Sequence, residues 1–247
     1  MDTGDNVAIS GFIITGNSPK KVAVRGLGPS LPSAGFSKLS DPTIKLRRAN
    51  NSLIASNDNW RDDPAAAEQL KSKKLAPQND LESAVVATLV PGAYTAVMSG
   101  VNNATGMGLI EVYDLDSASD SKLANISTRG FVRAGDDVVI GGFILGAGGR
   151  DTQVLVRALG PSLSDAGVRN AVGNPTLELR DGNGVLLQQN DNWKDHQQAA
   201  IEGTGVAPRD ELECAILATL PAGAYTAIAG GQGGTTGVGL IEIYNIR

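Results

Sequence analysis

The chain is short of the residue types on which many enzymes and metal sites depend. Its 247 residues include one cysteine, Cys214, and one histidine, His196. A lone cysteine excludes an intramolecular disulfide, and one cysteine with one histidine disfavours zinc. We expect Cys214 to be a small buried thiol. The alternative, a Cys214–His196 pair of nucleophile and base, could exist only in the second half of the chain.

Aromatic residues, long apolar runs and excess positive charge are also scarce. Aromatics make up 4% of the chain, so its cores should consist mainly of Val, Ile, Leu and Ala. No apolar run is long enough to span a bilayer, and no signal peptide is visible. The net charge is −5 and neither half has a basic surplus, so we expect no nucleic-acid partner and no membrane insertion.

What the chain does contain is an internal duplication. Three motifs recur at offsets of 132 (160−28), 133 (190−57) and 131 (223−92) residues. They are Gly-Pro-Ser-Leu from Gly28 and Gly160, Asn-Asp-Asn-Trp from Asn57 and Asn190, and Gly-Ala-Tyr-Thr-Ala from Gly92 and Gly223. A period of this length can close its own core, so the chain should form two homologous domains.

The apolar segments are short and rich in β-branched residues, and glycine and proline are frequent. Leu177 and Leu179 alternate with polar residues, as in a half-buried strand. We predict an all-β fold of two tandem homologous antiparallel β-sandwich domains, jelly-roll-like, over residues 2–115 and 123–247. Residues 116–122 would be a linker.

Each domain should also carry one short helix. In the first copy Asp63 can cap the helix, with Pro64 in its first turn. In the second copy Asp195 or His196 would precede a helix over Gln197–Ile201.

The apolar-polar segment Leu123–Val132 has no partner before Gly4. It could head the second copy or complete the first. An unpaired sheet edge invites pairing with another chain, so we expect self-association by strand exchange or as a homo-oligomer. Because Gly4–Val7 matches Gly135–Val138, we also expect a chain that begins inside a repeat, cut from a larger protein with an export signal.

The Asn-Asp-Asn-Trp loops are the strongest local signal for a ligand. Alternating oxygen side chains suit Ca²⁺. The alternative is that these side chains bond their own backbone in Asx-turns. No other cofactor is expected. The candidate metal ligands are Asn57, Asp58, Asn59 and Asp62 in the first copy, and Asn190, Asp191, Asn192 and Asp195 in the second.

Other recurring residues lie beside these loops. Glu82 and Glu213, just before a strand, would be solvated turn acids or extra ligands for the same metal. Trp60 and Trp193 would cover the edge of each core, with sugar stacking as the alternative.

Charges inside apolar strands recur in both copies. A charge in a buried strand needs a partner, so we predict the pairs Arg25–Glu111 and Arg157–Glu242. The alternative is a carboxylate acting in acid–base catalysis.

Enzyme signatures are otherwise weak, and we predict that the protein is not an enzyme. Ser30 and Ser162 lie in Gly-Pro-Ser-Leu, which is not the Gly-x-Ser-x-Gly nucleophile elbow. The first copy has no histidine for a Ser-His-Asp triad. A glycosidase needs only two carboxylates, so a hydrolase with paired carboxylates stays an alternative.

Several longer blocks resemble a tandem repeat of large exported bacterial proteins. They include Val-Arg-Ala-Leu-Gly-Pro-Ser-Leu, Asn-Pro-Thr-Leu-Glu-Leu and Gly-Val-Gly-Leu-Ile-Glu-Ile-Tyr. Thr176–Asn192 with Gly223–Thr226 is also similar to the bacterial pre-peptidase C-terminal domain. That second resemblance implies a jelly-roll-like sandwich of secreted proteins, sometimes calcium-bound.

From the resemblances we expect an extracellular or cell-surface module with a structural or adhesive, non-catalytic role. A calcium-assisted carbohydrate-binding module, with a glycan as partner, is the alternative.

Overall fold

The computed structural model describes residues 8–32, 37–133, 138–146 and 151–246. The chain forms two compact units, Met1–Ala124 (unit 1) and Asn125–Arg247 (unit 2). Each unit is described by itself. The match of Gly4–Val7 to Gly135–Val138 lies, except for Val138, outside the described residues.

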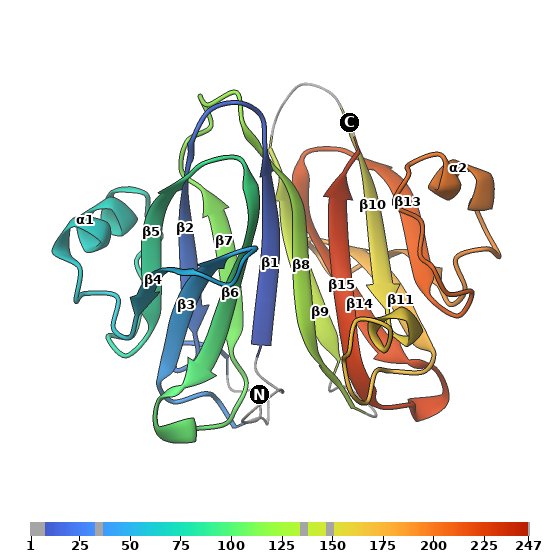
Figure 1. The fold of residues 1–247 in the computed structure, drawn as a ribbon, viewed down its shortest axis with the longest axis horizontal. Coiled ribbons are helices and arrows are strands. Elements are labelled where there is room, and N and C mark those ends of the chain that lie inside the picture. Colours follow the sequence, from blue (N-terminus) through green and yellow to red (C-terminus); the bar gives the residue numbers. More distant parts are fainter. Residues whose placement is uncertain (1–7, 33–36, 134–137, 147–150, 247) are drawn as a thin grey trace. The chain divides into compact units, whose positions relative to one another are not determined.

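The fold is all-β, with 51% of the described residues in strands and 10% in helices, and its antiparallel sheets are not closed. The predicted all-β antiparallel class is confirmed (Figure 1). Neither of the α-helices in the described part of the chain has the length and hydropathy of a membrane-spanning segment.

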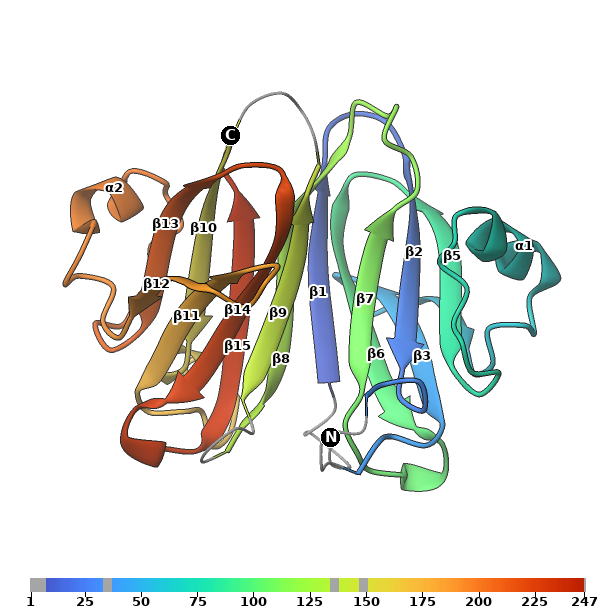
Figure 2. The same ribbon diagram turned by 180° about the vertical axis from the view of Figure 1, so that it is seen from behind.

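Unit 1 contains two sheets. Its strands are β1 (Ala8–Thr15), β2 (Lys20–Leu27), β3 (Pro42–Arg48), β4 (Leu53–Asn57), β5 (Ser83–Leu89), β6 (Gly92–Gly100) and β7 (Leu109–Asp114). One sheet has the order β1-β6-β3-β4 and the other the order β5-β2-β7. Figure 2 shows β5, β2 and β7 side by side, with β7 at one edge and α1 beyond β5 at the other.

Unit 2 repeats this arrangement with one more strand. Its strands are β8 (Lys122–Val132), β9 (Val139–Leu145), β10 (Thr152–Leu159), β11 (Pro175–Asp181), β12 (Leu186–Asn190), β13 (Cys214–Leu220), β14 (Gly223–Gly231) and β15 (Gly237–Asn245). The strand orders are β9-β14-β11-β12 and β13-β10-β15-β8. The counterpart of β15 in unit 1 is β7, and β8 has no counterpart among the described strands of unit 1.

Most of the segment Leu123–Val132 lies in unit 2. From Asn125 to Val132, β8 pairs antiparallel with β15, so this part of the strand belongs to the second copy. Residues 116–122, predicted as a linker, are bonded to unit 1. Lys20 Nζ donates to the Asp116 carbonyl at 2.7 Å, and Ser121 Oγ donates to the Ser18 carbonyl at 2.5 Å.

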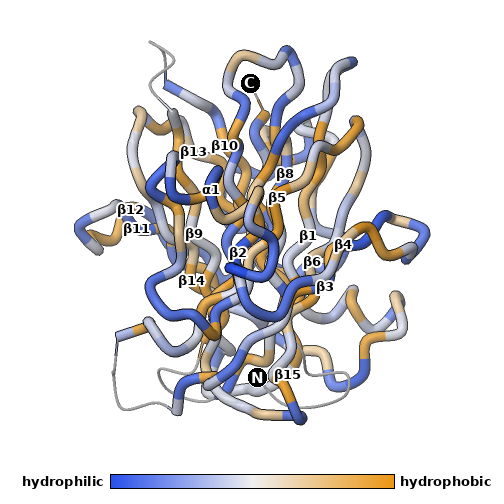
Figure 3. Tube along the Cα trace, turned by 90° about the vertical axis from the view of Figure 1, so that its left-hand side faces the viewer, coloured by the Kyte–Doolittle hydropathy of each residue, from blue (hydrophilic) through white to orange (hydrophobic). Residues whose placement is uncertain are grey.

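Each unit has one apolar cluster that draws on both of its sheets. In unit 1 the cluster includes Val24 on β2 and Ile44 on β3, and in unit 2 it includes Val156 on β10 and Leu177 on β11. Figure 3 shows hydrophobic segments concentrated along the strands and hydrophilic ones at many of the turns. Aliphatic residues dominate both clusters, as expected from a chain poor in aromatics.

The two short helices differ in how they begin. Asp63 caps α1 (Pro64–Ser72), accepting the N–H groups of Ala65 and Ala66, as predicted. The second helix begins and ends one residue later than predicted, and it has no side-chain cap. α2 (Gln198–Glu202) follows Gln197, which is in the left-handed region at φ 60° and gives no side-chain cap. The Gln197 amide instead bonds both backbone groups of Leu217 on β13, and these bonds hold it in place.

Candidate functional site

The Asn-Asp-Asn-Trp loop joins β4 to α1 in unit 1 and β12 to α2 in unit 2, and its first asparagine clamps the loop to the sheet. Asn57 Oδ1 accepts the Ala84 N–H at 2.8 Å, and Asn57 Nδ2 donates to the Asn59 carbonyl at 2.9 Å. Asn190 makes the same two bonds in unit 2. Both amides are therefore used within the fold, and neither side chain presents an uncommitted oxygen to a metal.

The tryptophan of each loop is buried against the side of the sheet that carries the helix. Trp60 is 2% exposed and packs with Ala23 and Leu70, and its Nε1 donates to the Asn79 carbonyl at 3.2 Å. Trp193 is 5% exposed and bonded in the same way to Asp210. These rings cover the apolar edge, as predicted. Because their faces are buried, neither ring offers a platform for a sugar.

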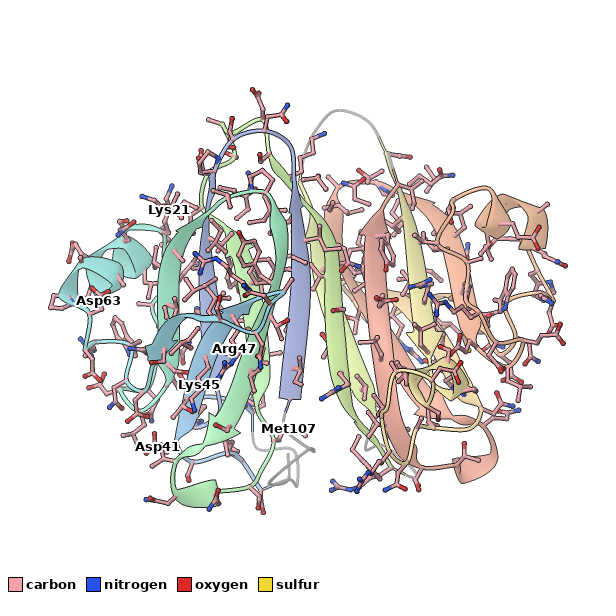
Figure 4. All side chains as sticks on the ribbon, in the orientation of Figure 1. Lys21, Asp41, Lys45, Arg47, Asp63 and Met107 are labelled. Atoms are coloured by element: carbon pink, nitrogen blue, oxygen red, sulfur yellow. The ribbon has the colours of Figure 1, made fainter. Side chains whose placement is uncertain are left out.

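Several oxygen atoms around the loops are buried without a hydrogen-bond partner in the described part of the chain. In unit 1 these are Oδ1 of Asn59, Oγ of Ser83 and Oδ1 of Asp41, a residue that the sequence did not single out. Burial raises the pKa of the Asp41 carboxyl, and the nearby Asp58 carboxylate raises it further. Figure 4 shows Asp41 where β3 begins. Its position follows from the β3–β4 pairing, which sets Ile44 opposite Asn57.

The same positions recur in unit 2, where the unpartnered oxygens are Oδ1 of Asn174, Asp191 and Asn192. Asn174 is the counterpart of Asp41, and the shared Asp/Asn-Pro-Thr motif was the sequence signal that could have identified both. The described residues contain no group of three His, Cys, Asp or Glu side chains placed to hold a metal ion. The loops therefore gather oxygen acceptors, most of them amides, with few charges.

The last predicted ligands lie on exposed turns. Asp62 gives its backbone N–H to the Asn59 carbonyl at 2.9 Å. Asp195 Oδ2 accepts from Asn192 Nδ2 at 3.5 Å, a long contact. The first contact is a backbone turn and the second joins two side chains, so neither is the Asx-turn offered as the alternative to calcium.

Glu82 and Glu213 are fully buried, so their interpretation as solvated turn acids is wrong. Glu82 Oε1 accepts the N–H groups of Gly28 (3.1 Å) and Ser30 (3.0 Å) and the Ser30 hydroxyl, and Oε2 accepts the Asn79 N–H at 3.3 Å. Glu213 makes the equivalent bonds in unit 2. A carboxylate that accepts this many donors can be kept inside a protein. The motif Gly-Pro-Ser-Leu is therefore its binding loop.

The glycine of that motif is needed because another backbone passes close to it. A Cβ on Gly28 would lie 2.1 Å from the Leu39 carbonyl oxygen, and one on Gly160 would lie 2.2 Å from that of Val172. No side chain fits at such distances, so both copies require glycine here.

The predicted pairs Arg25–Glu111 and Arg157–Glu242 are present. The strands place each arginine directly opposite its glutamate, and Arg25 Nε donates to Glu111 Oε2 at 2.8 Å. The Arg25 guanidinium also donates to the Leu75 carbonyl at 2.6 Å and to the Tyr113 hydroxyl at 3.1 Å. Each pair thus fixes strand order and ties the helix-bearing loop to the sheet.

Burial is the main reason that the tyrosines beside these pairs resist ionisation. Burial first, and then the neighbouring Glu111 and Glu242 carboxylates, raise the pKa of Tyr113 above its ordinary value and that of Tyr244 to about 12. The tyrosines therefore stay neutral donors to their glutamates.

Cys214 is buried in the apolar core of unit 2, as expected. Burial raises the pKa of its thiol, and the Asp191 and Glu213 carboxylates raise it further. A thiol in this environment is a poor nucleophile. His196 lines a hollow of about 300 Å³ together with Asn190 and Ala215, and Cys214 is not among the lining residues.

A second hollow in unit 2, of about 200 Å³, is lined by Arg157, Leu159, Ser162, Pro208, Arg209 and Glu242. It contains one carboxylate, that of Glu242, and this group is bonded to Arg157. The hollow does not hold the pair of free acids that a glycosidase needs.

Comparisons with known proteins give no family. No protein-family model matches the chain, and no curated protein matches it. Among solved structures, the chain is similar to one in the atomic structure of Sulfolobus turreted icosahedral virus, at 13% identity over 95% of this chain and 85% of that one. The TM-score is 0.27, and a likeness this weak carries no argument about fold or function.

Proposed function

We propose that the chain is a non-catalytic structural or adhesive module of an exported or cell-surface bacterial protein, built from two jelly-roll-like β-sandwich repeats. One observation carries this proposal. The charged residues that recur inside both repeats, Arg25, Glu82 and Glu111 with their counterparts, bond to their own unit. The charged residues that the two repeats share are therefore those that stabilise the fold. The resemblance to tandem repeats of exported bacterial proteins supports the location.

The proposal is tested by separating stability from activity. The wild type and the variants Glu82→Gln and Glu111→Gln would be assayed on a panel of glycoside and ester substrates, with unfolding by urea measured in parallel. We expect the substitutions to lower the unfolding midpoint and no variant to show turnover. Turnover by the wild type that either substitution abolishes, with the unfolding midpoint unchanged, would favour the alternative of a hydrolase with paired carboxylates.

A second candidate function is cation binding at the Asn-Asp-Asn-Trp loops. The unpartnered oxygens of Asp41 and Asn59, beside the Asp58 carboxylate, favour it. Oxygen donors of this kind suit Ca²⁺, which would supply charge neutralisation there. The buried tryptophans leave a glycan only the polar loop surface, so calcium-assisted glycan binding would depend on the cation.

Calorimetric titration with CaCl₂ tests this candidate. We expect unit 1, with two carboxylates, to bind more tightly than unit 2, where Asn174 replaces Asp41. Asp41→Asn should therefore weaken binding in unit 1 and make it resemble unit 2, whereas the control Glu68→Gln, an exposed carboxylate on α1, should leave binding unchanged. Absence of any heat with CaCl₂ would remove the candidate, and a glycan array with and without CaCl₂ would then show whether a glycan binds alone.

A further inference from the structure

The outer edge of β7 is left unpaired by the described strands of unit 1. β7 pairs with β2 on one side, and no described strand of unit 1 pairs with its other side. In unit 2 the counterpart strand, β15, lies between β10 and β8. An unpaired edge strand offers a row of N–H and C=O groups to another strand.

The backbone direction along β7 identifies which groups lie at this edge. Leu115, just beyond the strand, donates its N–H to the Lys21 carbonyl at 2.9 Å, on the β2 side. Backbone groups of successive residues in a strand point in alternate directions. The odd-numbered residues of β7 therefore face β2, and the N–H and C=O groups of Ile110 and Val112, together with those of Gly108, face outward.

Side chains at the edge of β7 are more exposed than their counterparts at β15. Met107, just before β7, is 41% exposed, whereas its counterpart Val238 is 8% exposed. Ile110 is half-buried, whereas its counterpart Ile241 is 0% exposed. The residue types are similar, so the difference comes from the strand that covers β15 and not β7. Figure 4 shows Met107 at the end of unit 1 from which β7 starts.

β8 shows what kind of strand fits. Its Val132 side chain is 0% exposed and lies over Gly239, where a Cβ would be 3.1 Å from Val132 Cγ2. The counterpart of Gly239 is Gly108, so β7 also has a glycine without a side chain at this position. Asn125 Nδ2 donates to the Ile243 carbonyl at 3.2 Å, and the counterpart carbonyl is that of Val112, at the outer edge.

We propose that the outer edge of β7 binds an extended strand of another polypeptide, antiparallel, with the sequence pattern of β8. The occupant is the leading strand of a homologous repeat. In the register of β8 on β15, its equivalents of Ile126, Thr128 and Gly130 lie opposite Val112, Ile110 and Gly108. This inference rests on the proposed structural role, because a strand supplied by a neighbour would join the module to the next one.

The experiment uses the whole chain and a synthetic peptide with the sequence of residues 122–132. We expect saturable binding in calorimetry. We also expect amide hydrogen exchange at Gly108, Ile110 and Val112 to slow by about tenfold or more at saturation, because these groups become hydrogen-bonded. The matched amides of Gly239, Ile241 and Ile243 already face β8, so their exchange should not change.

Two N-methylated peptides provide a matched pair without altering the protein. Methylation at Ile126 and Thr128 removes N–H groups that would bond to β7, and should reduce binding by about a hundredfold or abolish it. Methylation at Ser127 and Arg129 places the methyl groups on the far side of the peptide, and should leave binding within about twofold of the parent.

Three outcomes would overturn the inference. The first is no binding up to the solubility limit of the parent peptide. The second is equal binding of the two methylated peptides, which would show that strand pairing is not involved. The third is a dimer in sedimentation whose β7 amides are protected from hydrogen exchange without peptide. That result would assign the edge to a second copy of this chain. Turnover in the substrate panel, measured without peptide, would instead contradict the proposed function.

Discussion

In unit 2 the side chains of Ile241 and Ile243 on β15 are 0% and 6% exposed, whereas their counterparts Ile110 and Val112 on β7 are only half-buried. The two strands have closely similar sequences, and both pair with an equivalent strand, β10 or β2. The difference follows from β8, because β8 pairs with β15 and not with β7. Burial is thus a property of the neighbouring strands as much as of the residue itself.

At the carboxylate anchors, by contrast, the two units are alike. Glu82 and Glu213 are both fully buried, and each accepts donors from its Gly-Pro-Ser-Leu loop. The donors to each carboxylate all come from the same repeat, so the anchors need no strand from outside it. The duplication has therefore preserved internal bonds in both units and has left one sheet edge different.

The largest expected effect tests the likeness of the anchors. Glu82→Ala and Glu213→Ala each remove a buried acceptor and leave several N–H groups without a partner. Each should cost its own unit about 3 kcal/mol in free energy of unfolding. Urea unfolding followed by hydrogen exchange and mass spectrometry would assign the loss to a unit. If only one of the two variants destabilised its own unit, the two anchors would not be equivalent.

The next effect tests the difference at the edge. Ile241→Ala should cost about 3 kcal/mol because the Ile241 side chain is fully buried, and Ile110→Ala about 1 kcal/mol because the Ile110 side chain is only half-buried. The same exchange measurement, read on β14 for unit 2 and on β6 for unit 1, gives both values. Equal losses would mean that the edge of β7 is covered in solution.

A smaller effect concerns the helices. Asp63→Ala removes the side-chain cap of α1 and should cost about 1 kcal/mol. The matched variant in unit 2 is His196→Ala, at the position that corresponds to Asp63, and it should change stability little because α2 has no side-chain cap there. Thermal unfolding followed by circular dichroism measures both, and a larger loss for His196→Ala would contradict the assignment of the cap.

The smallest effect appears at high pH. In the folded state the pKa of Tyr244 is raised to about 12 from 10, so folded protein keeps a proton that the unfolded chain has lost. Stability should therefore fall as pH rises from 10 to 12, and Tyr113, whose pKa is also raised, should add to the slope. Urea midpoints across this range measure it. Tyr244→Phe should flatten the slope, and an unchanged slope would show that other groups cause it.

The sequence was sufficient for features that depend on short-range pattern. Alternating apolar residues predicted the strands, Asp63-Pro64 predicted the cap of α1, and charges repeated inside apolar strands predicted the pair Arg25–Glu111. Each of these follows from a local rule or from the cost of burying an unpaired charge. The bounds of α2 were predicted one residue too early, because Gln197 is held by tertiary bonds to β13 in a left-handed conformation.

The candidate site was predicted only in part. The Asn-Asp-Asn-Trp loops were found from composition, but Asn57 and Asn190 proved to be clamps to the sheet, and Asp41 was missed. Asp41 precedes Asp58 by seventeen residues (58−41) and reaches the loop only because β3 and β4 pair. Calcium at these residues stays a prediction.

By itself the amino-acid sequence determined that this chain is all-β and duplicated, and that its strands contain charges of opposite sign. These properties follow from the alternation of apolar and polar residues and from the internal repeat. Only the tertiary structure decided that Glu82 is buried among N–H groups that it accepts, and that β8 pairs with β15. Both depend on segments distant in the chain, and no local pattern records which of two open edges a strand will pair with.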